Sequence, residues 1–413
     1  MPRLARALAA PVASALLLVG CGGSEVWRES PDEAPRRWVA AVGAAQDARG
    51  PAGEAVTDTT VRMVLRPTAS GTALRVRLEN RFGETAVTFG GVSVGLRAAG
   101  AAVVPGTLRR VTFGGDLAVT LPPGARVTSD PVELPVQEQA DLAVSLYVPG
   151  PEAPASGHRN ALVTSYRTAA GAGDAVGEEG ASPFVAATGW TLWVAGIDVL
   201  STAAGAVVAF GSSSTEGVGA TPDGYDRWTD RLARRLGERP AAERRAVVNA
   251  GIGGNTLLAW PSSPGAGPPG LERLDADALD LAGASHLILF HGSNDIARGA
   301  GADQVIAALE QVAARAAERG IAVVGATIGP RTYSNPAAMH AVRHAVNAWI
   351  READAYRGVI DFDAVLRDPT DPDRLRPEYD SGDHVHPNPA GYAAMAAAID
   401  LDLFVPVAAA GAP

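Results

Sequence analysis

Residues 207–215, VVAFGSSST, place a short run of apolar side chains directly before a glycine and three serines. A run of this length, bounded by a turn residue, is typical of a strand that is buried on both faces. In open α/β sheets, ligand-binding residues gather at the carboxyl ends of the strands. A serine in a tight turn from strand to helix can present its hydroxyl at that edge. This stretch therefore predicts an α/β region with a candidate nucleophile among the three serines.

The rest of the C-terminal half repeats this alternation. Apolar runs of strand length recur at residues 246–248, 287–290, 321–326 and 358–360. Between them, apolar residues follow the spacing of a helix, as at Trp228, Leu232 and Leu236, at Val305, Leu309 and Val312, and at Val342, Val346 and Ile350. Buried strands that alternate with amphipathic helices predict a parallel sheet covered by helices on both faces.

The pattern from about Trp38 to Leu200 has period two instead. Apolar residues alternate with other residues at Leu74, Val76 and Leu78, at Leu117, Val119 and Leu121, and at Leu142, Val144, Leu146 and Val148. Many short strands without intervening helices predict an all-β sandwich or jelly-roll-like domain. A chain of 413 residues is expected to form two globular units. We place the β-sandwich accessory domain at residues 36–202 and the α/β domain at residues 203–408.

Three further segments follow predicted strands or precede the last predicted helix. The glycine-rich segment 249–256 offers backbone N–H groups, and the segment 292–295 contains an asparagine that could donate a hydrogen bond. Each could equally be a simple turn. In the segment 380–389, Asp383 and His386 are three residues apart, so the carboxylate could orient the imidazole. A metal cluster of Asp383, His384 and His386 is the alternative, but the sequence offers no evident further ligands.

Together the four segments resemble the blocks of the GDSL/SGNH hydrolase family, in the same order. The corresponding blocks are Gly211–Thr215, Gly251–Asn255, Gly292–Asp295 and Asp383–His386, and the resemblance covers roughly residues 204–404. It implies a three-layer α/β/α, flavodoxin-like fold and an esterase mechanism that needs no cofactor.

The resemblance also implies the role of each site residue. Ser213 corresponds to the nucleophile, His386 to the general base and Asp383 to the residue that orients the base. The N–H groups of Ser213 and Gly254 and the side chain of Asn294 would form the oxyanion hole. Ser212 departs from the family pattern, which has an aspartate there, and this leaves the choice of Ser213 over its neighbours open to test. The loop from Gly329 to Pro336 and the stretch from Thr256 to Gly270 are expected to shape the pocket.

The expected substrates are carboxylic esters with short acyl groups, either small molecules or O-acetylated polysaccharides. The upstream β-region resembles the domain that precedes the hydrolase domain in some bacterial members. Two other functions stay open at this point. One is O-acyl transfer to glycans, and the other is a non-catalytic surface protein that keeps the fold.

The composition excludes several other kinds of chemistry. All 35 basic residues are arginines, so neither a lysine Schiff base nor a phosphate-binding loop with lysine is available. The formal net charge is −10 and there is no basic run, so no nucleic acid partner is expected.

The N-terminus is typical of an export signal. Arg3 and Arg6 precede an apolar stretch of signal-peptide length, and Leu18–Cys21 resembles a bacterial lipobox. We therefore expect residues 1–20 to be a lipoprotein signal peptide, Cys21 to be lipidated, and residues 21–35 to be a tether. The protein would be an exported, membrane-anchored lipoprotein. An ordinary cleaved signal, which would give a secreted protein, is the alternative.

Overall fold

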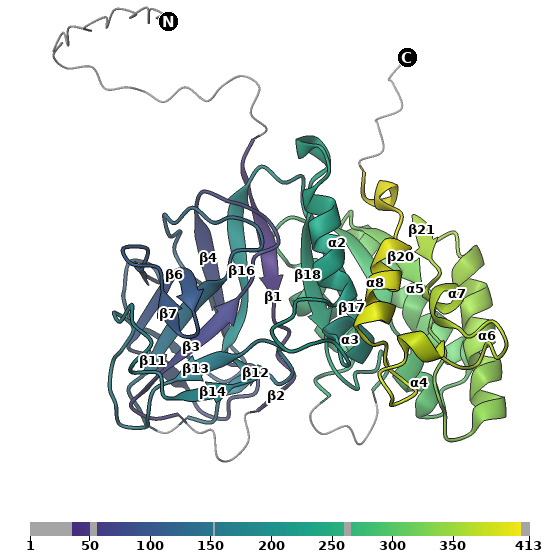
Figure 1. Cartoon of the computed structure of the whole chain (residues 1–413), viewed down its shortest axis with the longest axis horizontal. Coiled ribbons are helices and arrows are strands. Elements are labelled where there is room, and N and C mark those ends of the chain that lie inside the picture. Colours follow the sequence, from purple (N-terminus) through teal and green to yellow (C-terminus); the bar gives the residue numbers. More distant parts are fainter. Residues whose placement is uncertain (1–34, 50–55, 152, 260–265, 406–413) are drawn as a thin grey trace, which may run out of the picture. The chain divides into compact units, whose positions relative to one another are not determined.

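Two antiparallel sheets form most of the N-terminal β-rich region (Figure 1). The computed structural model describes residues 35–49, 56–151, 153–259 and 266–405. The first sheet has the order β1 (Arg37–Gly43), β16 (Val194–Ser201), β4 (Leu74–Glu79) and β10 (Arg126–Thr128). The second has the order β14 (Ala186–Thr188), β13 (Ser165–Arg167), β3 (Thr59–Leu65), β11 (Leu142–Val148), β6 (Gly91–Ala99) and β7 (Ala102–Val103), and β8 (Arg109–Val111) pairs with β6. Smaller sheets join β15 (Thr191–Leu192), β12 (Ser156–His158) and β2 (Ala48–Arg49), and β5 (Val87–Phe89) with β9 (Val119–Leu121).

The period-two pattern marks the strands correctly where a strand is long. In β4, Leu74, Val76 and Leu78 are buried, and the alternate residues Arg75 and Arg77 are half-buried. Apolar residues of both large sheets enter one core, because Val76 and Leu78 share a cluster with Leu142 and Val144 of β11. The pattern fails at Leu117, which is 48% exposed and precedes β9.

The C-terminal half contains a five-stranded parallel sheet, as the sequence predicts. Its strands are β17 (Ala206–Gly211), β18 (Ala246–Gly251), β19 (Ala284–Phe290), β20 (Ala322–Ala326) and β21 (Gly358–Ile360). The spatial order is β18-β17-β19-β20-β21. Numbered along the chain this is 2-1-3-4-5, the order of flavodoxin-like sheets, in which the strand order reverses between the first and third strands.

Helices pack apolar side chains against this sheet. They are α1 (Ser213–Glu216), α2 (Trp228–Gly237), α3 (Gly270–Leu274), α4 (Ser293–Ala297), α5 (Ala302–Glu318), α6 (Pro336–Glu352), α7 (Phe362–Leu366) and α8 (Pro389–Ala397). Short turns of other helix types lie at Ala241–Glu243, Asp275–Leu279, Pro377–Tyr379 and Leu401–Phe404. Both α6 and α8 begin with proline, whose missing N–H costs nothing at a helix start. The side chain of Asn388 accepts hydrogen bonds from the first turn of α8.

Successive residues of β17 join different cores, as expected for alternating side chains. Val207 and Ala209 pack in one cluster with Trp228 of α2 and with residues of α8. Val208 and Phe210 belong to the other cluster, with residues of α3, α5 and α6. This second cluster also contains the core of the β-rich region, so the apolar interior is continuous between the two halves.

Direct contacts join the two halves along β18, the edge strand of the parallel sheet (Figure 1). The Thr68 hydroxyl accepts from the N–H of Val247 at 3.0 Å, and it lies 2.9 Å from the carbonyl oxygens of both Val247 and Ala41, to which it can donate. The N–H of Ala40 in β1 donates to the carbonyl of Ala282 at 2.8 Å. From Pro35 onward the described residues form one compact unit. The predicted boundary between residues 202 and 203 falls in the link between β16 and β17.

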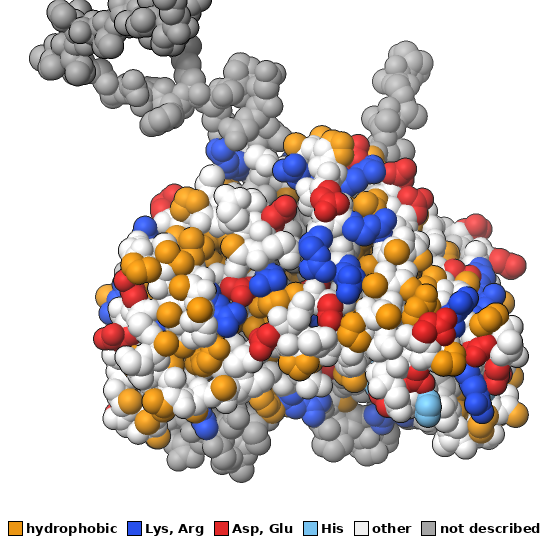
Figure 2. Space-filling view, viewed as in Figure 1, with side chains coloured by type: hydrophobic (Ala, Val, Ile, Leu, Met, Phe, Trp, Pro, Cys, Tyr) orange, Lys and Arg blue, Asp and Glu red, His pale blue; other side chains and the backbone are white. Residues whose placement is uncertain are grey.

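The N-terminal predictions concern a different part of the chain. The signal peptide, the lipidation site Cys21 and the tether at residues 21–34 lie outside the described residues. Among the residues that are described, no helix combines the length and the apolar character needed to cross a bilayer. On the face shown in Figure 2, arginine and acidic side chains are interspersed.

Candidate active site

Ser213 lies where the sequence places the candidate nucleophile, in the turn between β17 and α1. It is the first residue of α1, two residues after the strand end at Gly211. A Cβ atom at Gly211 would lie 2.1 Å from Thr215 Oγ1, so only glycine fits this tight turn. The indole of Trp228 donates to the carbonyl of Ser214 at 3.0 Å, which ties the turn to α2. The serine is therefore presented by a turn that is fixed on both sides.

The structure brings Ser213, His386 and Asp383 into one hydrogen-bonded chain. His386 Nε2 lies 2.8 Å from Ser213 Oγ, and His386 Nδ1 lies 2.6 Å from Asp383 Oδ2. The N–H groups of Val385 and His386 donate to Asp383 Oδ1 at 2.9 and 2.8 Å. Burial acts to raise the pKa of Asp383, but these hydrogen bonds outweigh it and hold the pKa well below the usual range. Asp383 thus stays ionised and fixes the ring with Nε2 toward the serine.

The two neighbouring serines do not share this contact. In the described part of the chain, neither the Ser212 hydroxyl nor the Ser214 hydroxyl makes a hydrogen bond, and Ser212 does not cap α1 with its side chain. Among the three serines, geometry singles out Ser213.

The predicted oxyanion donors come from three loops. Gly254 adopts φ +73°, a conformation that favours glycine. The N–H groups of Ser213 and Gly254 have no hydrogen-bond acceptor among the residues that the structure describes. Asn294, in α4, donates from Nδ2 to the carbonyl of Asn255 at 2.9 Å, which leaves its second N–H available.

The positions of these residues follow from the strand order. Ser213 follows β17 and Asn294 follows β19, and the two strands are neighbours at the point where the order reverses. Crevices form there because the connections on either side run in opposite directions. A small pocket beside Ser213 lies at this edge, and its apolar lining residues are Phe290, Ile328, Pro330, Leu366, Leu375, Val385 and Pro387. Gly329, Pro330 and Arg331 of the first predicted loop line it, whereas the described residues of the stretch from Thr256 to Gly270 do not.

Arg331 is a site residue that sequence reasoning did not identify. Its Nη1 donates to Asn294 Oδ1 at 3.2 Å and to Ser293 Oγ at 3.3 Å. The first bond fixes which end of the Asn294 amide carries the N–H groups. Burial lowers the pKa of Arg331, although Tyr333 and Asp383 act in the opposite direction.

Arg273 is a second residue that sequence reasoning did not identify, and its side chain holds the backbone on which the site residues are carried. Its guanidinium is fully buried and donates to the carbonyls of Gly211 and Ala250 and to Asn255 Oδ1, each at 2.9 Å. Desolvation lowers its pKa to about 10, so it stays charged at neutral pH. One side chain thus joins the ends of β17 and β18 to the loop that carries Gly254. A lone arginine among helical residues gives no sequence signal of this role.

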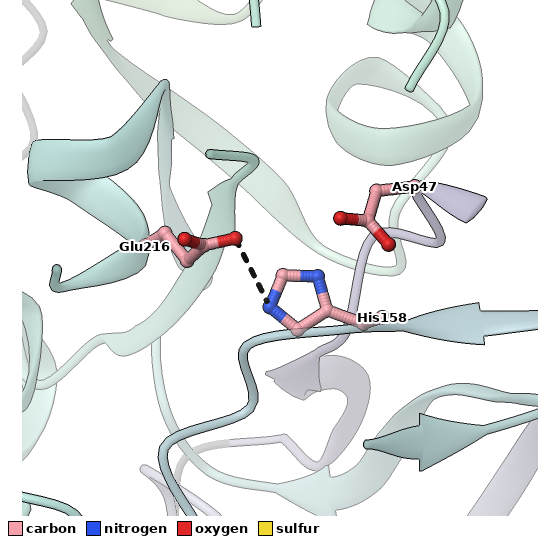
Figure 3. Close-up of side chains that lie close together, drawn as sticks. All are labelled: Asp47, His158 and Glu216. Atoms are coloured by element: carbon pink, nitrogen blue, oxygen red, sulfur yellow. Dashed lines mark ion pairs between the residues drawn. The ribbon is translucent and has the colours of Figure 1, made fainter. Parts of the chain in front are cut away.

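Glu216 connects the nucleophile turn to the β-rich region (Figure 3). Its buried carboxylate accepts from the N–H of Gly253 at 2.9 Å and from Asn160 Nδ2 at 3.3 Å. His158 Nε2 lies 3.7 Å from Glu216 Oε1, while His158 Nδ1 lies 2.9 Å from the carbonyl of Ala45. Burial is the main cause of the raised pKa of Glu216, and His158 opposes it. One carboxylate therefore holds together α1, the loop that carries Gly253 and Gly254, and the β-rich region.

Asp47, His158 and Glu216 are side chains of metal-ligating types, with one ligand atom from each within 4.8 Å of the others (Figure 3). Their carboxylates are already engaged by the protein. Arg159 donates from its N–H and Nε to the two oxygens of Asp47 at 3.1 and 2.9 Å. Both oxygens of Glu216 accept as described above. We therefore treat the cluster as a junction of hydrogen bonds and ion pairs.

The metal alternative at the C-terminal block has a different geometry. His384 Nδ1 pairs with Asp380 Oδ2 at 2.6 Å, whereas His386 pairs with Asp383. Within the described ranges, Asp383, His384 and His386 do not converge as a ligand group. The two histidines belong to separate Asp–His pairs.

The fold and the site thus define an α/β protein with a serine–histidine–aspartate chain at the switch point of its sheet. Residues 209–394 match the model of the GDSL-like Lipase/Acylhydrolase family. No curated protein matches the chain.

Solved structures with similar folds each cover about half of this chain. A GDSL-like lipase from Bacteroides thetaiotaomicron VPI-5482 is 20% identical, with 48% of this chain and 87% of that chain covered and a TM-score of 0.37. A member of the lipolytic protein G-D-S-L family from Veillonella parvula DSM 2008 is 24% identical, covering 47% and 94%, with a TM-score of 0.35. A carbohydrate acetylesterase from Sinorhizobium meliloti is 16% identical, covering 48% and 96%, with a TM-score of 0.37.

Proposed function

We propose that this protein is a serine esterase that hydrolyses carboxylic esters through an acyl-enzyme on Ser213. The observation that carries the proposal is the hydrogen-bonded chain from Ser213 Oγ through His386 to Asp383. A serine hydroxyl is a weak nucleophile until a neighbouring base takes its proton. His386 Nε2 lies within proton-transfer distance, and the ionised Asp383 stabilises the imidazolium that forms.

The reaction has two halves. Ser213 Oγ attacks the ester carbonyl while its proton passes to His386 Nε2, and the resulting tetrahedral oxyanion collapses as the C–O bond to the alcohol breaks. His386 gives its proton to the departing alcohol. Water then attacks the acyl-enzyme with His386 as the base, and the acid is released as Ser213 recovers its proton.

The oxyanion of each intermediate would be bound by the N–H groups of Ser213 and Gly254 and by Asn294 Nδ2. The free N–H groups of Ser213 and Gly254 and the second N–H of Asn294 support this assignment. Prearranged donors of this kind each contribute roughly 3 kcal/mol to the stabilisation of the transition state. No cofactor takes part in the proposed reaction.

The cellular setting is proposed from the sequence alone. The lipobox-like Leu18–Cys21 supports export and lipid attachment at Cys21. An exported esterase would meet small-molecule esters and O-acetylated polysaccharides, which we propose as substrates.

The test is the hydrolysis of p-nitrophenyl acetate and butyrate by residues 22–413, with Ser213→Ala, Ser212→Ala and Ser214→Ala beside the wild type. We expect Ser213→Ala to lose at least three orders of magnitude in kcat/KM. The other two variants should stay within about tenfold, because their hydroxyls do not contact His386. A fluorophosphonate probe should label the wild-type protein on the Ser213 peptide and should not label Ser213→Ala.

Other outcomes point to other functions. Equal activity of the wild type and Ser213→Ala would show that Ser213 is not the nucleophile, and Ser212 and Ser214 would become the candidates. Faster acyl transfer to an added sugar than to water would identify an O-acyltransferase. If the folded wild type hydrolyses neither aryl nor sugar esters and the probe does not label it, the remaining alternative is a non-catalytic binding protein.

A further inference from the structure

A second hollow opens next to the pocket beside Ser213, and five of its seven lining residues are polar or charged. Its volume is about 360 Å³, within the range of small-molecule sites. It is lined by Thr332, Asp368, Arg374, Leu375, Asp380 and His384, together with Pro377. Leu375 also lines the pocket beside Ser213, so the two hollows adjoin.

Three groups in this hollow have hydrogen-bonding capacity to spare. Thr332 Oγ1, His384 Nε2 and the Nη atoms of Arg374 make no hydrogen bond with any residue that the structure describes. They come from three separate loops. Their convergence offers a ligand both donors and acceptors.

His384 is held in place rather than left loose at the surface. Its Nδ1 lies 2.6 Å from Asp380 Oδ2, and its N–H donates to Asp380 Oδ1 at 3.0 Å. Its carbonyl accepts from the N–H of Thr332 at 2.9 Å. The residue adopts φ +61°, which is uncommon for any residue other than glycine. These contacts leave Nε2 as the ring nitrogen that a ligand can reach.

The charges in the hollow disfavour an anionic ligand. Asp368 and Asp380 both have pKa values below the usual range, since hydrogen bonds to their carboxylates outweigh the opposing effect of burial at Asp380. Arg374 is paired with Asp371, with Nε 3.2 Å from Oδ2. Ionised carboxylates would repel an anion, while hydroxyl groups can bond to carboxylates, imidazole and guanidinium alike.

We propose that this hollow binds the alcohol part of the ester and that the alcohol is polyhydroxylated, as in a sugar. The inference rests on the proposed esterase function. His386 must deliver a proton to the departing alcohol, and His384 stands two residues from His386 at the rim of the polar hollow. A short acyl group then lies against the apolar side chains of the pocket at Ser213, and the sugar extends past Leu375 to the polar side chains of the second hollow.

The experiment compares two acetyl esters, p-nitrophenyl acetate and a mono-O-acetylated methyl xyloside, by acetate release. The variants are Thr332→Val, Arg374→Ala and His384→Asn. Asparagine tolerates the left-handed backbone of residue 384 and removes the imidazole. Arg109→Ala is the control, because Arg109 is exposed in the β-rich region and bonds only to nearby carbonyls.

We expect each variant to lower kcat/KM for the sugar ester about tenfold relative to the aryl ester, mainly through KM, while the control keeps the wild-type ratio. Thermal melting of each variant shows whether it is folded, and Thr332→Val, which keeps the side-chain shape, tests the inference if the others melt early. An unchanged ratio in folded variants overturns the subsite and leaves the esterase standing. A folded wild-type protein that hydrolyses neither the aryl ester nor the sugar ester would instead contradict the proposed esterase function.

Discussion

His158 of the β-rich region places Nε2 3.7 Å from Oε1 of Glu216, three residues after the candidate nucleophile. The same carboxylate oxygen accepts the N–H of Gly253, the residue before the predicted oxyanion donor Gly254. The β-rich region therefore contacts the proposed catalytic loops through the buried carboxylate of Glu216, which Figure 3 shows beside His158. It acts as part of the support of the site and not only as a neighbour.

Removing this carboxylate should impair the reaction without touching the substrate. Glu216→Ala leaves the N–H of Gly253 without its acceptor, a loss worth about 1–2 kcal/mol. We expect kcat for p-nitrophenyl acetate to fall about tenfold with little change in KM. Glu310→Ala, at an exposed position of α5, is the matched control. If Glu216→Ala and Glu310→Ala have the same kcat, the hydrogen bond from Gly253 to Glu216 does not position the loop that carries Gly254.

The same residue predicts a pH dependence of stability. Burial raises the pKa of Glu216 above its ordinary value of 4.5, so above 4.5 the folded state binds more protons than the unfolded state. The free energy of unfolding should therefore decline as pH rises from 4.5 through the raised value. Glu216→Gln removes this titration. We expect the wild type to lose stability relative to Glu216→Gln over that range in urea unfolding, and a constant difference would contradict the prediction.

Arg331 should matter through Asn294. Asn294→Ala removes a proposed oxyanion donor and should lower kcat by about 10²- to 10³-fold. Arg331→Met removes the hydrogen bond to Asn294 Oδ1 but not the donor, so we expect a smaller decrease of about tenfold. In the double variant the two effects should not add, because Arg331 has nothing left to orient. Additive losses would show that Arg331 acts independently of Asn294.

Gly43 tests the packing between the two halves. A Cβ atom there would lie 2.4 Å from Val248 Cγ1 and 2.9 Å from the carbonyl oxygen of Asn249. We expect Gly43→Ala to lower the free energy of unfolding by about 1–3 kcal/mol, as overpacking does. Gly177→Ala, where a Cβ meets nothing within 4 Å, should have little effect. Fluorescence and circular dichroism should report one shared transition, since the core is continuous.

The sequence predicted features that depend on neighbouring residues. The apolar run before Gly211 marks β17 because a strand buried on both faces needs no polar side chains. The spacing of Asp383 and His386 predicts their contact because three residues of one loop can bring both side chains together. The β-rich region was visible in its period of two, except at Leu117, where the alternation continues beyond the strand.

Contacts between distant segments were not predictable in this way. Arg273 reaches the ends of two strands, and nothing in its local sequence distinguishes it from a solvent-exposed helical arginine. His158 and Glu216 are in contact because the two halves pack together. Neither residue belongs to a sequence motif or a periodic pattern that would predict this contact. Their roles depend on tertiary packing, which periodicity does not encode.

The hydrogen bonds between Thr68 and edge strand β18 affect whether the protein can associate with itself in solution. An edge strand with free N–H and carbonyl groups is a template onto which another chain can add a strand. Because its hydroxyl lies within hydrogen-bond distance of both groups of Val247, Thr68 occupies that template at the middle of β18. The β-rich region thereby shields the parallel sheet from self-association, and a fragment that began at residue 203 would carry an open, aggregation-prone edge.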